Sequence, residues 1–409
     1  MRWPTRQFES HFAGKFGSRW EALKRSLESS VNHIAWINSF ADFSAIPAAF
    51  RTDWFATIEH SSGCTLAGRW HHEASDAKLP RPKAVPCSQS SSGDEQNLKS
   101  HYALDGASIF PVLALAPRRG QRVLDLCAAP GGKSLCLAGQ LFNASFGSDG
   151  GGADAAAAPS ASSLLVANDC SAPRRARLRR VLAEFLPCQL LHEPHAAAVP
   201  IVGQTTGGAD ALAAAAVAAA GLGRDAVVVT GVDAARYSSS APSWSAGEFD
   251  RILVDAPCSS ERHFLRSLAA AAAAGPAKKQ RVRGGGATWS VSLLERNAAR
   301  QRSLLRNGAR LLAVGGRLVY STCSLADEEN DGVVSALLGH ERHGKGLVLV
   351  DALDGPLAEP SIAPLLAGVS RTECGALALP DESAFGPLYW AVIERRADLG
   401  RDGYGPLYK

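Results

Sequence analysis

The stretch RVLDLCAAPGGKS at residues 122–134 decides the fold of this 409-residue chain. Its first half is a short apolar run typical of a buried strand, and the segment GGKSLCLAGQLF at 131–142 begins like a helix. Small residues in such a turn let the backbone come close to a ligand, and a helix N-terminus offers free N–H donors. The turn therefore predicts a nucleotide-type binding site between a strand and a helix.

Two familiar phosphate-binding loops do not fit this turn. A P-loop requires a glycine five residues before Gly132, and Cys127 occupies that position. The dinucleotide-binding fingerprint G-x-G-x-x-G is not present in the turn either. A plain connection between a strand and a helix would not need Lys133, so a binding role is favoured.

Strands and helices alternate through the rest of the chain from about residue 100 onward. Apolar runs predict further strands at 163–170, 225–233, 250–258 and 315–324. Helical patterns lie between them at 173–186 and 293–313. Such alternation predicts an α/β fold, a doubly wound and mostly parallel sheet with helices on both faces. Two final apolar runs, at 346–353 and 388–396, predict an antiparallel hairpin at the sheet edge.

The chain is expected to have two parts. Residues 1–97 are predicted to be an N-terminal helical extension, helical to about residue 60, followed by a polar linker over 61–97. Residues 98–409 are predicted to form the α/β domain. Segments poor in large apolar side chains interrupt this domain and are expected to be loops or loose helices, at 144–163, 196–223 and 268–287.

Composition favours a globular protein in a reducing compartment. Hydrophobic residues make up 46% and charged residues 20% of the chain, and no uninterrupted apolar run predicts a membrane span. The nine cysteines form no C-x-x-C pair, so no metal site is expected. The N-terminus is basic but also carries Glu9 and Glu21, which favours an ordinary amphipathic helix over a mitochondrial presequence.

Three of the predicted strands end at an aspartate, namely Asp169, Asp233 and Asp255. In an open parallel sheet, ligands bind outside the carboxyl ends of the strands, and an acid after the second strand can accept hydrogen bonds from ribose hydroxyls. A lone aspartate in such a place is usually a helix cap. Three of them beside a glycine-rich turn favour ligand binding.

Two cysteines also stand at strand ends, Cys258 in PCSS and Cys323 in STCS. Most cysteines in proteins are buried and inert. These two lie where the fold opens to a ligand, on strands that are expected to be adjacent. A thiolate in that place can act as a nucleophile if its pKa is lowered.

Basic residues cluster in three segments, although the net charge is only +4. For the predicted helix at 173–186, a solvated face and a contact with RNA are equally favoured. For KKQRVR at 278–283, which lies between two candidate catalytic strands, contact with phosphates is favoured. The predicted helix at 293–313 carries five further arginines.

With these motifs in this order, the chain resembles the Nop/Sun family of RNA cytosine-5 methyltransferases. The resemblance covers about residues 100–340 through LDLCAAPGGKS, VDAPCSS and YSTCSL. Four further segments resemble the mitochondrial ribosomal-RNA branch of the family in particular, namely QFESHFAGKFGSRW, HYALDGASIFPVLAL, SERHFL and FGPLYWAVIERR. The resemblance implies a Rossmann-like methyltransferase domain that uses S-adenosylmethionine as methyl donor.

The resemblance also implies which residues bind this cofactor. Asp169 would hold the ribose hydroxyls, Asp233 would bind the adenine edge, and Asp255 and Arg174 are assigned to the same site. The methionine and ribose side would be lined by Cys127, Ala128, Ala129, Pro130, Gly131, Gly132 and Lys133.

Catalytic roles follow from the same resemblance. Cys323 would attack carbon 6 of the target cytosine, Cys258 would assist release of the product, and Asp255 would bind the cytosine ring. The chemistry agrees, because addition of a thiolate at carbon 6 turns carbon 5 into an enamine-like carbon that can accept a methyl group. A carboxyl group such as that of Asp255 suits hydrogen bonding to the ring nitrogen as charge develops. The target nucleotide must be unstacked or single-stranded.

Other functions stay open at this point. DNA cytosine-5 methyltransferases use the Pro-Cys thiol and lack the Thr-Cys strand end, so Cys323 argues against them. A non-catalytic ribosome assembly factor could retain the fold, although both cysteines and the turn are intact. The resemblance implies RNA as partner, ribosomal RNA first and transfer RNA as the alternative. It also implies a ribosome-assembly protein as a further partner and the mitochondrion as the compartment, with no membrane partner.

Overall fold

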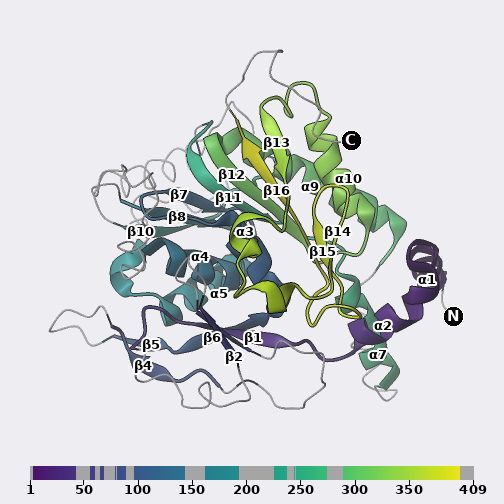
Figure 1. Ribbon diagram of the computed structural model, residues 1–409, viewed down its shortest axis with the longest axis horizontal. Helices are drawn as coiled ribbons and strands as arrows, with labels where there is room; N and C mark the ends of the chain where they lie inside the picture. The colour runs from purple at the N-terminus through teal and green to yellow at the C-terminus, as the bar shows by residue number, and fades with distance from the viewer. Residues whose placement is uncertain are drawn as a thin grey trace.

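The computed structural model describes residues 3–42, 56–59, 65–68, 79, 81–88, 96–142, 162–192, 225–236, 244, 246–273 and 289–396. A large sheet forms its centre (Figure 1). The strands of this sheet are β7 (Arg122–Asp125), β8 (Leu164–Asn168), β9 (Leu191–His192), β10 (Ala226–Thr230), β11 (Phe249–Asp255), β12 (Leu312–Thr322), β13 (Leu347–Val350), β14 (Val369–Arg371), β15 (Ala376–Ala378) and β16 (Leu388–Arg395). They follow the order β14-β15-β16-β12-β11-β7-β8-β10-β9, and β13 also pairs with β16.

The prediction of a mostly parallel sheet is confirmed. All neighbours from β12 to β9 are parallel, whereas β16 is antiparallel to both β12 and β13. The two final runs are therefore antiparallel as predicted, but β16 lies inside the sheet rather than at its edge. Strand β7 lies between β8 and β11, where the strand order reverses, and open α/β sheets bind their ligands at that point.

Helices cover both faces of the sheet, as the alternating pattern predicts. One face carries α3 (Phe110–Leu115), α4 (Gly132–Phe142) and α5 (Ala172–Phe185), and the other carries α7 (Glu261–Ala273), α9 (Val291–Leu311) and α10 (Asp331–Leu338). Successive side chains of β8 alternate between the two cores, with Leu165 on one side and Val166 on the other. Strands buried on both faces are continuous apolar runs, which is why they stand out in the sequence.

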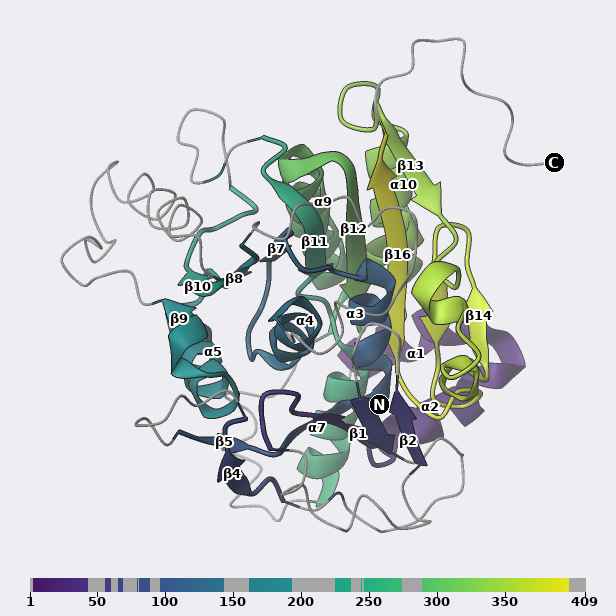
Figure 2. The same ribbon diagram turned by 60° about the vertical axis from the view of Figure 1, so that its left-hand side comes forward.

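The N-terminal extension is helical only in its first part. Helices α1 (Trp3–Phe16) and α2 (Trp20–Glu28) were predicted and are present (Figure 2). The helical prediction is wrong for the strands β1 (His33–Ile37) and β2 (Ala56–Glu59). The linker prediction is wrong for three further strands, β3 (Thr65–Gly68), β4 (Ala84–Pro86) and β5 (Asn97–Lys99).

These strands were missed because their partners lie far apart in the sequence. In β1, four of five residues are buried, so the segment HIAWI shows neither the alternation of a half-buried strand nor the period of a helix. It pairs with β6 (His101–Asp105), more than sixty residues later, in a sheet of order β2-β3-β1-β6. This small sheet joins residues from both sides of the predicted boundary at 97/98, and β6 lies against α4.

Parts of the predicted insertions fall outside the described residues. These parts are 144–161 and all of 196–223, together with 274–287, which includes the basic segment 278–283. Residues 268–273 belong to helix α7. Among the described residues, no helix combines the length and the apolar character needed to cross a membrane.

Candidate active site

The glycine-rich turn joins β7 to α4 at the switch point of the sheet. Gly131 has a φ of 116°, a backbone conformation that side chains other than glycine rarely adopt. A Cβ atom added at Gly132 would lie 2.7 Å from Cε1 of Tyr102, so the turn also needs glycine for its close approach to β6. The small residues of this turn therefore let α4 begin directly against the N-terminal sheet.

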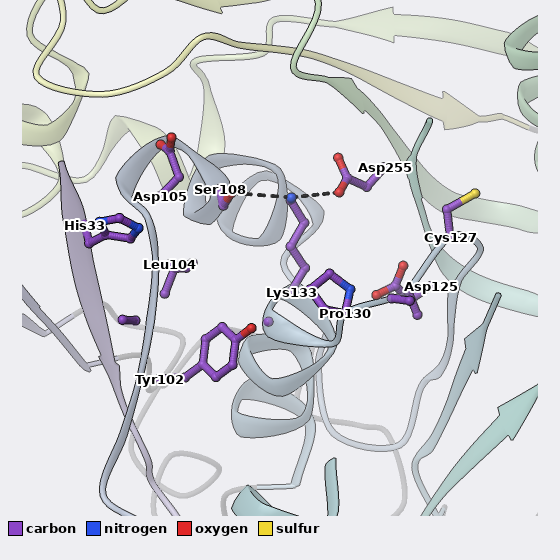
Figure 3. A pocket seen from close by; sticks show the side chains of 14 residues that line it. His33, Tyr102, Leu104, Asp105, Ser108, Asp125, Cys127, Pro130, Lys133 and Asp255 are labelled. Atoms are coloured by element: carbon purple, nitrogen blue, oxygen red, sulfur yellow. Dashed lines mark hydrogen bonds and ion pairs between the residues drawn. The ribbon is translucent and has the colours of Figure 1, made fainter. Parts of the chain in front are cut away.

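A cavity of about 220 Å³ opens beside this turn (Figure 3). Lys133 reaches into it from α4, and its Nζ lies 2.8 Å from Oδ2 of Asp255 at the end of β11. The other carboxylate oxygen of Asp255 accepts a hydrogen bond of 2.9 Å from the Ser321 hydroxyl on β12. Burial alone would lower the pKa of Lys133, but the carboxylates of Asp255 and Asp125 raise it, so the side chain stays a cation.

The opposite wall of this cavity comes from residues that the sequence did not suggest. His33, Tyr102, Asp105 and Ser108 line it from β1, β6 and the turn after β6. The Asp105 carboxylate forms an ion pair of 3.2 Å with Arg262 of α7. A signal was present, because Asp105 ends its strand just as the three predicted aspartates do. It was not recognised because the preceding segment was taken to be a linker.

A second cavity, of about 120 Å³, lies on the other side of Cys127. Asp169 and Asp233 line it from the ends of β8 and β10. Arg174 lies 3.3 Å from the Asp169 carboxylate and donates a hydrogen bond of 2.7 Å to the carbonyl of Ala129. The carboxylate of each aspartate also accepts a hydrogen bond from the backbone N–H two residues later. Each aspartate therefore caps the turn that follows it and lines the cavity as well. Of the residues predicted for the cofactor, all but Gly131 line one of the two cavities.

Asp125, at the floor of the larger cavity, is a fully buried acid. Its Oδ2 accepts a hydrogen bond of 2.6 Å from Ser134, whereas its Oδ1 has no partner among the described residues. Burial raises the pKa of Asp125 to about 7, against the opposing effect of the Ser134 hydrogen bond. A ligand with a hydrogen-bond donor could satisfy this free oxygen.

The raised pKa of Asp125 leads to a stability prediction. The folded protein holds the Asp125 proton more tightly than the unfolded chain, so the free energy of unfolding should fall as pH rises through the window between the unfolded pKa and about 7. Asp125→Asn keeps an acceptor for Ser134 but cannot ionise. Between about pH 5 and about pH 8, its free energy of unfolding should therefore fall by about 2–3 kcal/mol less than that of the wild type. Chemical denaturation at both pH values measures the effect, and equal losses in variant and wild type would contradict it.

The two predicted catalytic thiols lie in contact. The Sγ atoms of Cys258 and Cys323 are 3.1 Å apart. The hydrogen bond from Cys258, helped by one from Ser260, lowers the pKa of the Cys323 thiol against the effect of burial. The same bond, burial and the charges of Cys323, Glu329 and Glu261 raise the pKa of Cys258 well above its ordinary value. This asymmetry favours Cys323 as the thiolate and Cys258 as its proton-bearing partner.

Two buried carboxyl groups behind Cys258 were not predicted from the sequence. Glu261 and Glu329 are both fully buried. The hydroxyl of Ser259 lies within hydrogen-bond distance of both, at 2.5 Å from Oε2 of Glu329, and donates its single proton to one of them at a time. A signal for them exists, since each follows a predicted cysteine motif within six residues, in CSSE and in CSLADEE.

Two further features concern the rim of the site. Arg300 of α9 lines the smaller cavity and lies 3.3 Å from the sulfur of the exposed Cys170. Within the part of the chain that the structure describes, no group of three or more His, Cys, Asp or Glu side chains could hold a metal ion.

Comparison with known proteins identifies a common activity among the relatives. A family model described as 16S rRNA methyltransferase RsmB/F matches residues 209–354, the part that contains both cysteine motifs. The mitochondrial tRNA (cytosine(34)-C(5))-methyltransferase of Mus musculus is 28% identical over 337 residues, which cover 80% of this chain and 75% of the relative. The 5-cytosine rRNA methyltransferase NSUN4 of Mus musculus is 26% identical over 413 residues, which cover 96% of this chain and 89% of the relative.

A solved structure supports the fold. The crystal structure of NSun6 from Pyrococcus horikoshii with SFG superposes with a TM-score of 0.52 at 14% sequence identity, covering 96% of this chain and 98% of that one. At this identity the likeness concerns the fold alone.

Proposed function

Because the chain belongs to the Nop/Sun family of S-adenosylmethionine-dependent RNA (cytosine-5) methyltransferases, we propose that it methylates ribosomal RNA through a covalent bond between Cys323 and the target cytosine. One observation carries this proposal. The two thiols lie 3.1 Å apart at the same sheet edge as the Lys133–Asp255 pair, so the side chains that we assign as nucleophile, proton-bearing partner and ring-binding carboxylate lie together.

The two cavities fit the chemistry of S-adenosylmethionine, which supplies an electrophilic methyl carbon when bound. We assign the ribose hydroxyls to Asp169 and the adenine edge to Asp233, both in the smaller cavity. The free oxygen of Asp125 suits the ammonium group of the methionine part, because a buried acceptor gains most from a charged donor. Cys127, which lines both cavities, marks the connection between them.

The role of Asp169 can be tested by calorimetry. Asp169→Ala should weaken binding of S-adenosylmethionine by about 1.5–3 kcal/mol, because a charge-assisted hydrogen bond is lost. The exposed Asp354→Ala serves as a control and should bind with the affinity of the wild type. An unchanged affinity in Asp169→Ala would remove this residue from the site.

The proposed reaction begins with the thiols. The Cys323 thiolate adds to carbon 6 of the cytosine while Cys258 holds its proton. Asp255, fixed by Lys133 and Ser321, accepts a hydrogen bond from the amino group of the ring and so holds the base in place. The ammonium of Lys133, paired with Asp255, offsets the negative charge that develops on the ring. Carbon 5, now nucleophilic, accepts the methyl group.

Release requires loss of the proton on carbon 5. Once the sulfur of Cys323 is bonded to carbon 6, its hydrogen bond and its thiolate charge no longer raise the pKa of Cys258, although the effects of burial and of Glu329 and Glu261 remain. Cys258 can then release its proton to water and take the proton from carbon 5. The electrons of that C–H bond re-form the double bond between carbons 5 and 6, and the bond to sulfur breaks to return the Cys323 thiolate.

Ribosomal RNA is the proposed substrate, with transfer RNA as the alternative. NSUN4 of Mus musculus matches 96% of this chain at 26% identity. The transfer-RNA enzymes of Mus musculus and Danio rerio match 80% at 28% identity and 95% at 25% identity, which supports the alternative. The matched transfer-RNA enzyme is named as mitochondrial, which supports a mitochondrial location as part of the proposal. A ribosome-assembly protein is the further partner proposed.

Methyl transfer to isolated RNA fractions tests the substrate. The full-length protein with methyl-labelled S-adenosylmethionine should label ribosomal RNA, and bisulfite sequencing should place the label on one cytosine. Labelling of transfer RNA alone would replace the proposed substrate by the alternative. Binding of ribosomal RNA without any methylation would support an assembly factor instead.

A further inference from the structure

We propose that Glu261 and Glu329 are positioning residues, a buried anionic pair that keeps the proton on Cys258 and thereby makes Cys323 the nucleophile. Two thiols at 3.1 Å share one proton when one of them is ionised, so the surrounding charges decide which sulfur attacks. The catalytic meaning of this inference rests on the proposed function, but the ionisation that it describes does not.

Glu329 holds both chain neighbours of Cys258. The backbone N–H of Ser259 donates to both of its oxygens at 3.1 Å. Gln301 donates to Oε1 of Glu329 at 3.3 Å and to the carbonyl of Pro257 at 2.8 Å. The carboxylate is therefore fixed behind Cys258 by residues on either side of it.

Glu261 joins the loops of the two cysteines. It accepts hydrogen bonds from the Ser259 hydroxyl, next to Cys258, and from the backbone N–H of Leu325 at 2.9 Å, two residues after Cys323. Both glutamates are fully buried, and burial raises the pKa of Glu261 to about 6, which leaves it mostly ionised at neutral pH. Charges in such a place act through protein rather than through water and are weakly screened.

The charges around Cys323 are different. Its sulfur lies within electrostatic range of the ammonium of Lys133 and the guanidinium of Arg262. Asp255 and Glu261 also raise the pKa of Cys323, but Asp255 is paired with Lys133, and Glu261 acts on both thiols. Glu329 behind Cys258 and the cations before Cys323 thus act in the same direction, toward a thiol at Cys258 and a thiolate at Cys323.

Site-resolved alkylation tests this arrangement without requiring methylation. The full-length protein is treated briefly with iodoacetamide at neutral pH, and mass spectrometry of the peptides gives the ratio of Cys258 to Cys323 labelling. In the wild type, Cys323 should dominate. Glu329→Gln, which keeps a hydrogen-bond acceptor but removes the charge, should raise the ratio roughly tenfold, because one pKa unit changes the thiolate fraction tenfold. Glu261→Gln should raise the ratio less, because the charge of Glu261 acts on both thiols.

Two control variants separate charge from packing. Glu329→Asp keeps the charge and should keep the ratio close to that of the wild type. Asp331→Asn removes a carboxylate two residues from Glu329 whose hydrogen bonds come from Thr372, Glu373, Cys374 and Tyr389, and it should leave the ratio unchanged. If Glu329→Gln does not fold, Glu261→Gln and Glu329→Asp decide the matter.

The outcomes distinguish the inference from the proposed function. A ratio that stays at the wild-type value in the folded glutamine variants overturns the inference, even if Cys323 is essential for methylation. A ratio that rises as expected, in a protein whose Cys323→Ala variant still methylates RNA, supports the inference about the thiols and overturns the covalent mechanism.

Discussion

Cys323→Ala is expected to abolish methylation of RNA, with a fall in rate of roughly 10⁴-fold or more, as is typical when an enzyme loses its nucleophile. Without the thiolate, carbon 5 of the cytosine stays a poor nucleophile and no covalent bond to the RNA can form. The variant should still bind S-adenosylmethionine, because Cys323 lines neither of the two cavities described above. Transfer of a labelled methyl group measures the loss.

A matched control is available at Cys188, which is exposed and lies on a short helical turn before β9. Cys188→Ala should keep the wild-type rate. If Cys323→Ala also kept that rate, the sulfur pair would be structural, and its loss would be expected to cost about 1–2 kcal/mol of stability without any effect on chemistry.

Cys258→Ala is expected to give the opposite signature, a protein that stays attached to its RNA. Attack by Cys323 and methyl transfer do not require removal of a proton by Cys258, so the adduct should form. Elimination should stall because the base for the proton on carbon 5 is missing. Denaturing gels should show a complex of protein and RNA that the wild type does not accumulate.

The loss of Cys258 also removes the hydrogen bond that favours the Cys323 thiolate, so the adduct should form more slowly than in the wild type. An adduct in Cys323→Ala and none in Cys258→Ala would reverse the two roles. That result would indicate that the Pro-Cys thiol is the nucleophile, as in the DNA enzymes.

The residues that could be predicted from the sequence share a simple origin. Asp169 and Cys323 directly follow a strand, Asp255 ends one, and Asp233 and Cys258 lie three residues beyond one. These strands are buried on both faces and are therefore continuous apolar runs. Once the strands are recognised as parallel, their ends must meet at one edge of the sheet. The local pattern and the parallel topology are therefore sufficient to predict that these residues lie close together at one edge of the sheet.

The residues that could not be predicted depend on contacts between distant segments. Tyr102 reaches the larger cavity because β6 pairs with β1, a strand whose sequence shows no clear period. Glu261 and Glu329 stand on separate elements and meet only through the hydroxyl of Ser259. A charged residue near a motif is usually exposed, so burial of both glutamates could be learned only from the packing.

The central claim, covalent catalysis by Cys323 on RNA, is tested most directly by trapping the wild-type protein on RNA that contains 5-azacytidine. The nitrogen at ring position 5 prevents normal release, so an active thiolate should stay bonded to the base. Peptide mass spectrometry of the trapped complex should find the modified nucleotide on Cys323. Methylation of ordinary RNA without any trapped complex, or a complex formed only on Cys258, would contradict the account.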